Sequence, residues 1–137
     1  MDVLKTLKDI QYLRLDLKYI EDKLTELRNK MTSITSAGNS DITPGSHVFN
    51  SNNKLDNNLV SIEELQKKIC TTRKRIIELE EQVEIKLEVL EPKERLVIKL
   101  YYFEGETIEY ICGVVNYSYR HTKRIYRLAL GKLEGVE

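Results

Sequence analysis

The residues best suited to bind a charged ligand lie near the C-terminus, in the stretch NYSYRHTKRIYR at positions 116–127. It contains four lysine or arginine residues, one histidine and three tyrosines, but no aspartate or glutamate. Guanidinium and ammonium groups bind phosphate oxygens, and arginine also pairs with two acceptors on guanine. Because the whole chain has 22 basic and 22 acidic residues, no overall field attracts nucleic acid, and such binding must be local.

A helical wheel divides residues 118–133 into two faces. At about 100° per residue, five side chains lie within about 60° of one direction. These are Thr122, Ile125, Tyr126, Ala129 and Leu133. The opposite direction holds Arg120, Arg124, Arg127 and Gly131, with Lys123 at the flank. We therefore expect a helix with one packed face and one cationic face.

Charged residues opposite an apolar face are ordinary on a surface helix, so the charge balance of the other helical segments is the useful comparison. Residues 1–31 hold seven basic and six acidic residues, and residues 59–90 hold six and seven. Segment 116–132 instead holds five basic residues and no acid. The helix macrodipole does not account for this, since it disfavours Arg120 and Lys123 in the N-terminal half. The one-signed face favours binding to DNA.

The predicted DNA contacts form one set at the start of this helix. They are Ser118, Tyr119, Arg120, Lys123, Arg124 and Arg127. We assign Arg120 and Arg124 to base edges, and Lys123 and Arg127 to phosphates. Tyr119 would contact a thymine methyl group or a phosphate, with partial packing against the protein as the alternative.

No constellation of residues suggests catalysis or metal binding. His47 and His121 are far apart in the sequence, and Cys70 and Cys112 form no pair with ligand spacing. There is no phosphate-binding glycine loop and no nucleophile motif. We therefore expect a protein that is not an enzyme and needs no cofactor or metal. Two isolated cysteines, no signal peptide and no long apolar run indicate a soluble intracellular protein without a membrane span.

Apolar residues at alternating gaps of three and four predict a long helix over residues 3–32. They are Ile10, Leu13, Leu17, Ile20, Leu24, Leu27 and Met31, with Val3 and Thr6 extending the pattern toward the N-terminus. This is the heptad pattern of a coiled coil. One narrow apolar stripe cannot bury itself, so the helix needs a partner.

A second apolar stripe predicts a second helix over residues 61–90. Its members are Ile62, Leu65, Ile69, Thr72, Ile76, Leu79, Val83, Lys86 and Leu90. Ser61 and Glu64 match a capping box at the start of this helix. Pro92 disfavours helix at the residue before it, so the helix should end near Leu90.

Residues 33–58 are rich in Ser, Asn, Thr, Gly and Asp and are interpreted as a flexible loop. Two striped helices joined by such a loop predict an antiparallel coiled-coil hairpin over residues 1–90. A parallel dimer, in which each stripe is buried between two chains, fits the same pattern.

Three short helices are expected after the hairpin, in a domain of residues 91–137. Gly105 ends the first, and Thr107 is interpreted as the N-cap of the second. A short turn then leads to Ser118, the N-cap of the last helix, whose N-terminus also suits a phosphate. This is the layout of a helix-turn-helix with residues 118–133 as the recognition helix in the major groove. The predicted fold is thus all-α.

The last 45 or so residues resemble region 4 of the sigma-70 family, in the stretch LEPKERLVIKLYYFEGETIEYICGVVNYSYRHTKRIYRLALGKL. Residues in register with the family pattern are Tyr102, Glu104, Gly105, Thr107, Ile111, Ser118, Arg124, Ala129, Leu130, Lys132 and Leu133. Three positions depart from it: Tyr110 stands where Glu is usual, Cys112 replaces Ala, and Thr122 replaces Val. We expect the hydroxyl of Thr122 to bond a carbonyl one turn back. No region 2-like segment is present, so the chain does not resemble a full sigma factor.

The whole layout resembles the ArpU/RinA-type regulators of late genes in phages and prophages. That resemblance implies a transcriptional regulator that binds double-stranded DNA in the bacterial cytoplasm, at the nucleoid. It also implies a hairpin that forms a homodimer or contacts RNA polymerase. Two alternatives stay open, a ring-forming DNA-packaging protein of the small-terminase kind and a coiled-coil module that binds a protein, as an anti-activator or a polymerase-binding protein does. The number of subunits and binding to DNA at low salt distinguish them.

Overall fold

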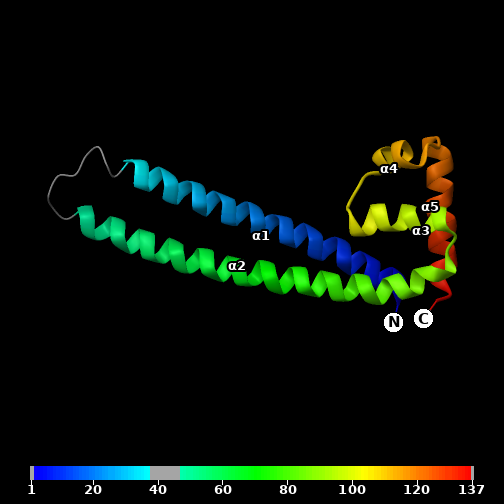
Figure 1. The fold of residues 1–137 in the computed structure, drawn as a ribbon, viewed down its shortest axis with the longest axis horizontal. Helices are drawn as coiled ribbons and strands as arrows, with labels where there is room; N and C mark the ends of the chain where they lie inside the picture. Colours follow the sequence, from blue (N-terminus) through cyan, green and yellow to red (C-terminus); the bar gives the residue numbers. More distant parts are fainter. Residues whose placement is uncertain (1, 38–46, 137) are drawn as a thin grey trace. The chain divides into compact units, whose positions relative to one another are not determined.

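The computed structural model describes residues 2–37 and 47–136, and in those ranges every regular element is a helix (Figure 1). In chain order they are α1 (Val3–Ala37), α2 (His47–Lys86), the 3-10 turn η1 (Leu87–Val89), α3 (Pro92–Ile98), the π-helical segment η2 (Lys99–Phe103), α4 (Ile108–Val115) and α5 (Tyr119–Glu134). The all-α prediction is confirmed. A long hairpin of α1 and α2 precedes a small helix-turn-helix bundle.

The chain divides into two compact units that do not follow the predicted domain boundary. One unit comprises Met1–Leu15 with Lys74–Glu137, and the other comprises Asp16–Arg73. The first turns of α1 and the last turns of α2 thus belong with the C-terminal helices. The division into domains of residues 1–90 and 91–137 stays a prediction.

In the unit Asp16–Arg73, the two helices pack through the predicted apolar stripes. Ile20, Leu24 and Ile69 are buried together, and Leu17, Ile62 and Leu65 pack against them. An ion pair between Arg73 and Glu21, with a nitrogen–oxygen distance of 2.6 Å, joins the helices beside this core. Burying one stripe against the other stabilises both helices, because neither stripe is then exposed to water.

In the other unit, the start of α1 lies beside the end of α2, and the predicted stripes are again buried (Figure 1). Fully or nearly fully buried side chains are Val3, Leu7 and Ile10 on α1, and Ile76, Leu79 and Val83 on α2, followed by Leu87 in η1. Arg14 on α1 forms an ion pair with Glu80 on α2.

The predicted start of the second helix at Ser61 is wrong, because α2 begins at His47. The helix α1 also continues to Ala37, so the predicted loop 33–58 is helical at both ends. Its remaining residues, 38–46, lie outside the described residues. Asn and Ser cost only about 0.5–0.7 kcal/mol each in a helix relative to Ala, so a polar composition alone does not end one.

A sequence signal for the earlier start exists in the seven-residue spacing. Val48 and Leu55 continue, at that spacing, the series of Ile62, Ile69, Ile76 and Val83. The residues that break helices most strongly, Gly38, Pro44 and Gly45, all precede His47. The capping box at Ser61 was therefore a chance match inside a continuous helix.

The end of the hairpin is close to the predicted position. After η1, Leu90 and Glu91 have extended backbones with ψ of 150° and 156°, and Pro92 is the first residue of α3. Glu91 also forms a capping box with Glu94, which sequence analysis did not identify. An extended residue before proline is the conformation that the proline ring imposes.

Candidate nucleic-acid interface

A side-chain cap stands at the start of each of α4 and α5. The hydroxyl oxygen of Thr107 accepts a hydrogen bond from the N–H of Tyr110 at 3.2 Å, and that of Ser118 accepts one from the N–H of His121 at 3.2 Å. Both predicted N-caps are confirmed. Between them Asn116 adopts the left-handed conformation, with φ of 59° and ψ of 40°. Asparagine tolerates this conformation better than most residues, so a short turn can redirect the chain into α5.

The inward face of α5 is the one predicted from the wheel. Thr122, Ile125, Ala129 and Leu133 are buried, and Tyr126 is half-buried. Ile125 packs with Val97 of α3 and Ile111 of α4 in one core cluster. The bundle of α3, α4 and α5 thereby fixes which side of α5 faces solvent.

The hydroxyl of Thr122 does not make the expected bond to a carbonyl one turn back. Its Oγ1 atom is buried and has no hydrogen-bond partner among the described residues. Thr71 in α2 does donate its hydroxyl hydrogen bond to the carbonyl of Lys67, so such a bond is possible within a helix but is not formed by Thr122. The prediction that this hydroxyl satisfies itself is wrong.

A pair of tyrosines anchors the middle of α5 to η2. The hydroxyl oxygens of Tyr102 and Tyr126 are 2.8 Å apart and share a hydrogen bond, and the ring of Tyr101 lies 5.0 Å from that of Tyr126. Burial raises the pKa of both Tyr102 and Tyr126 above the ordinary value of 10.0. Both phenols are therefore protonated at neutral pH, and the pair acts as a neutral link.

A charged contact anchors the C-terminal end of α5 to α3. The Nζ atom of Lys132 lies 2.6 Å from Oε1 of Glu94, whose side chain is only 7% exposed. The hydrogen bond to Glu94 raises the pKa of Lys132 above 10.5. Lys132 was one of the five basic residues counted in this segment. Its contact with Glu94 separates it from the other four.

Those four residues form the surface that we call the basic face of α5: Arg120, Lys123, Arg124 and Arg127. The three arginines are exposed and Lys123 is half-buried, with its Nζ 5.5 Å from the centre of the Tyr119 ring. Within the described ranges, none of the four forms an ion pair. Their charges are therefore available to an external anion.

The basic face has a shallow open depression of about 480 Å³ between its long side chains. It is lined by Tyr119, Arg120, Lys123, Arg124, Arg127 and Leu128. Five of the six predicted contacts thus come together, and the sixth, Ser118, directly precedes them. All of these residues belong to one helix, so the depression lies between side chains on the surface and is not an enclosed cavity. The exposed side of a single helix fits the major groove of DNA, whereas a small molecule usually needs an enclosed pocket.

Two residues near this face were not predicted from the sequence. Leu128 is 57% exposed at its edge, and Lys93 of α3 places its Nζ 5.5 Å from the centre of the Tyr117 ring in the turn. The ring of Tyr117 also packs edge-on against His121, with 4.5 Å between the ring centres. Lys93 lies 24 positions before Tyr117 in the sequence, so only the fold brings its charge to the turn.

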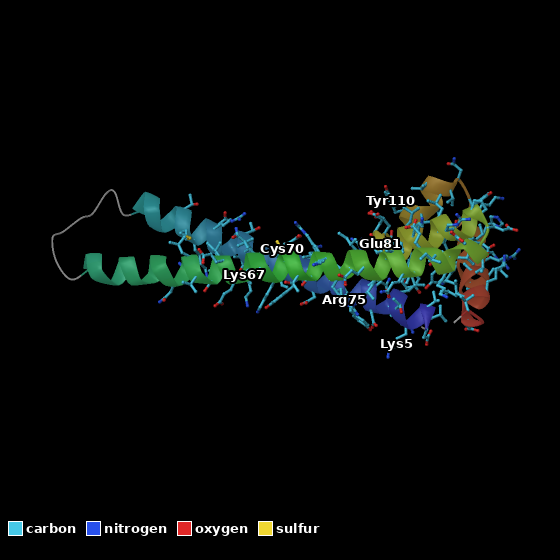
Figure 2. The ribbon with its side chains drawn as sticks, turned by 60° about the horizontal axis from the view of Figure 1, so that its bottom comes forward. Lys5, Lys67, Cys70, Arg75, Glu81 and Tyr110 are labelled. Atoms are coloured by element: carbon cyan, nitrogen blue, oxygen red, sulfur yellow. The ribbon has the colours of Figure 1, made fainter. Side chains whose placement is uncertain are left out.

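The other sequence candidates show no second site. In the described part of the chain, no group of three His, Cys, Asp or Glu side chains could hold a metal ion. Cys70 is exposed and Cys112 is half-buried, both as free thiols. Tyr110, which departs from the family pattern, is 53% exposed and replaces a polar residue at the surface (Figure 2). No described helix is long and apolar enough to cross a membrane.

One known protein family matches the bundle of α3, α4 and α5. Residues 87–134 match the family model of sigma-70, region 4. The match begins at η1 and ends with the last residue of α5. The chain matches no curated protein and no solved structure. Residues 87–134 are therefore similar to a sigma-70 region 4 domain, which is a DNA-binding helix-turn-helix.

Proposed function

We propose that this chain is a sequence-specific DNA-binding transcriptional regulator in which α5 enters the major groove. The observation that carries the proposal is the unpaired basic face of α5, in a segment that matches sigma-70, region 4. In a helix-turn-helix, the second helix lies in the major groove and its N-terminal residues contact base edges. The basic face occupies that position on α5.

The members of the basic face have different roles in this proposal. Arg120 and Arg124 are one turn apart on the side opposite the core, and they contact base edges. Lys123 and Arg127 contact phosphates on either side. Arginine suits the base contacts because its guanidinium group binds guanine O6 and N7 together. These four contacts supply both positioning and sequence preference.

The residues around the turn contact the DNA backbone. The Ser118 hydroxyl accepts the cap bond from His121, so a phosphate binds there through the free N–H groups of the helix N-terminus. Tyr119 is 47% exposed and contacts a thymine methyl group or a phosphate. Lys93 adds a further charge beside the turn.

The proposal extends to the hairpin and to the cellular setting. A helical hairpin joined to a region 4 domain, with no region 2-like segment, is the layout of the ArpU/RinA-type regulators of phage and prophage late genes. The chain would then act in the cytoplasm of a bacterial host, on double-stranded DNA. The hairpin would pair with a second copy of the chain or contact RNA polymerase.

Binding selection from random DNA, followed by affinity measurement on the selected sites, tests the proposal. Arg124→Ala should weaken binding to a selected site by about 1–3 kcal/mol and relax preference at one position, because a bidentate contact is lost. Lys5→Ala is the matched control, since Lys5 is an exposed base on α1 (Figure 2). No enrichment of any site, or equal loss in both variants, would contradict the proposal.

A further inference from the structure

The helix α2 balances its charges in total but separates them along its length. Residues 65–77 contain five basic residues and no acid, whereas residues 78–86, up to the end of α2, contain four acids and one base. The acid-free stretch includes Lys67 and Lys74, and the acid-rich stretch includes Glu81 and Glu84. The change of sign falls between Ile77 and Glu78. A helix of this kind is electrostatically complementary to a second copy that runs in the opposite direction.

One side of α2 at this position is free of α1. Lys74, Ile77, Glu81 and Ile85 recur at gaps of three and four residues, so they share one side of the helix. Lys74 and Glu81 are exposed, and Ile77 and Ile85 are 54% and 68% exposed (Figure 2 labels Glu81). We call these four residues the outer stripe of α2.

No ion pair of the described residues includes a member of the outer stripe, although Glu84, about 20° from Ile77 around α2, binds Lys99 of η2. Glu80, which binds Arg14 of α1, points to a different side of α2, about 100° from Glu81. Within the described ranges, neither Lys74 nor Glu81 forms an ion pair. Two large exposed isoleucines beside unpaired opposite charges are typical of a helix face that packs on another helix.

We propose that two copies of this chain pair through the outer stripes of their α2 helices, antiparallel, with Ile77 of one copy against Ile77 of the other. In this arrangement Lys74 of each copy lies opposite Glu81 of the other copy. Lys74 is three residues before the central Ile77, and Glu81 is four residues after it. The contact is two-fold symmetric, so each favourable pair occurs twice. The pairing rests on the proposed function in one respect, because it describes how the homodimer proposed there forms.

The charges select the antiparallel direction over the parallel one. In a parallel pair, residues 65–77 of both copies would lie together, and so would the acid-rich residues 78–86. Like charges placed opposite one another weaken such a pair, whereas the antiparallel pair brings opposite charges together. Two exposed isoleucines per copy form a small contact area, and exposed ion pairs contribute little each. The dimer is therefore salt-sensitive and dissociates on dilution.

Charge exchange tests the pairing in the full-length protein. Lys74→Glu should raise the dimer dissociation constant about tenfold by analytical ultracentrifugation, because it places Glu opposite Glu at both symmetric positions. The double variant Lys74→Glu/Glu81→Lys should restore the dimer, since each pair is rebuilt with its signs exchanged. Gln82→Ala, an exposed change outside the outer stripe, is the control. Failure of the double variant to restore pairing, with helicity intact by circular dichroism, would overturn the proposal.

Disulfide formation tests the direction. In the antiparallel pair, Cys70 of one copy lies opposite position 85 of the other copy. Cys70 is seven residues before Ile77, and position 85 is eight residues after it. The variant Ile85→Cys, with Cys112→Ser, should therefore form a covalent dimer on mild oxidation. Within one α2 these positions are about 22 Å apart, too far for an intrachain disulfide. The two Cys70 residues of the antiparallel pair are about 21 Å apart, so rapid Cys70–Cys70 crosslinking would indicate a parallel pair and overturn the proposal.

The two proposals fail independently. Lys74→Glu removes the pairing but leaves the basic face of α5 unchanged, so it should still bind non-specific DNA. Arg124→Ala weakens DNA binding and should sediment as the wild type does. A wild-type protein that binds its selected site but is monomeric at all concentrations would overturn the pairing alone.

Discussion

The hydroxyl oxygen of Thr122 is buried in α5 without a hydrogen-bond partner among the described residues. Burying an unsatisfied hydroxyl costs about 1–3 kcal/mol, and replacing it with an isosteric methyl group removes that cost. Thr122→Val should therefore raise the free energy of unfolding by about 1 kcal/mol, measured by urea denaturation. The same change at Thr71, an exposed residue whose hydroxyl donates to the carbonyl of Lys67 at 2.9 Å, should bring no comparable gain. A loss of stability in Thr122→Val would show that the hydroxyl is satisfied.

A second residue-level prediction separates folding from DNA binding on the same helix. Lys132→Ala should lower the free energy of unfolding, because it leaves the buried carboxylate of Glu94 without its ionic partner. Its affinity for DNA should change little. Arg124→Ala should show the reverse, a large loss of affinity with little loss of stability. If Lys132→Ala weakens DNA binding as strongly as Arg124→Ala does, Lys132 belongs to the basic face.

At this scale the sequence predicts faces and caps but not the contacts between distant residues. The inward positions of α5 and the caps at Thr107 and Ser118 follow from periodicity and local chemistry. The contact between Glu94 and Lys132 joins residues 38 positions apart, and no spacing rule connects them. The unsatisfied hydroxyl of Thr122 could not be predicted either, because it depends on the rotamer and the packing around it.

At the scale of elements, the tyrosine link between η2 and α5 makes the domain sensitive to alkali. Tyrosines of the unfolded chain lose their protons near pH 10, whereas burial raises the pKa of Tyr102 and Tyr126 in the fold. The stabilisation from these neutral phenols is therefore complete below pH 10 and is lost as the pH rises above it. Unfolding followed by urea from neutral pH to about 11 should show this loss.

Tyr126→Phe is the variant that isolates the alkaline effect. It removes one titrating phenol and the bond to the Tyr102 hydroxyl, so it should be less stable at neutral pH by about 0.5–1.5 kcal/mol. It should also lose less stability than the wild type as the pH rises. Tyr12→Phe is the control, because Tyr12 is 69% exposed. An alkaline loss of the same size in Tyr126→Phe and the wild type would exclude the tyrosine link as its cause.

The ends of helices were predicted correctly where a single residue type determines the backbone, and they were missed where the prediction relied on amino-acid composition. Pro92 fixes the end of the hairpin, because proline acts on its own and on the preceding residue. The start of α2 at His47 was missed, since a run of Asn and Ser was interpreted as a loop. The apolar spacing at Val48 and Leu55 continues the heptad series, and this weak pattern agrees with the helix found.

At the scale of the whole molecule, a net charge of zero makes the affinity for DNA depend on a few residues. Each phosphate neutralised contributes a slope of about −0.9 to a plot of log affinity against log salt. The two phosphate contacts proposed for Lys123 and Arg127 therefore predict a slope of about −2 per bound copy, measured by fluorescence anisotropy. Lys123→Ala should reduce its magnitude by about 1. A slope near zero would contradict binding through phosphates.

The arrangement of the whole chain was predictable in part. Two striped helices and a helix-turn-helix could be identified from the sequence, and the hairpin was one of two arrangements that the stripes allowed. The compact units could not be predicted, because they depend on which turns of α1 and α2 pack with the C-terminal helices. The separation of charges along α2 was present in the sequence, but totals over residues 59–90 concealed it.

Asn116 has the one positive φ angle found outside glycine in the described residues, and it lies between α4 and α5. The backbone there sets the angle at which α5 leaves α4, whereas the basic face sets what α5 contacts. In the proposed function, docking and sequence preference therefore depend on different residues. Substituting other residues for Arg120 and Arg124, while Asn116 and the inward face of α5 are kept, should therefore change the preferred DNA sequence. The orientation of α5 on the DNA should stay the same.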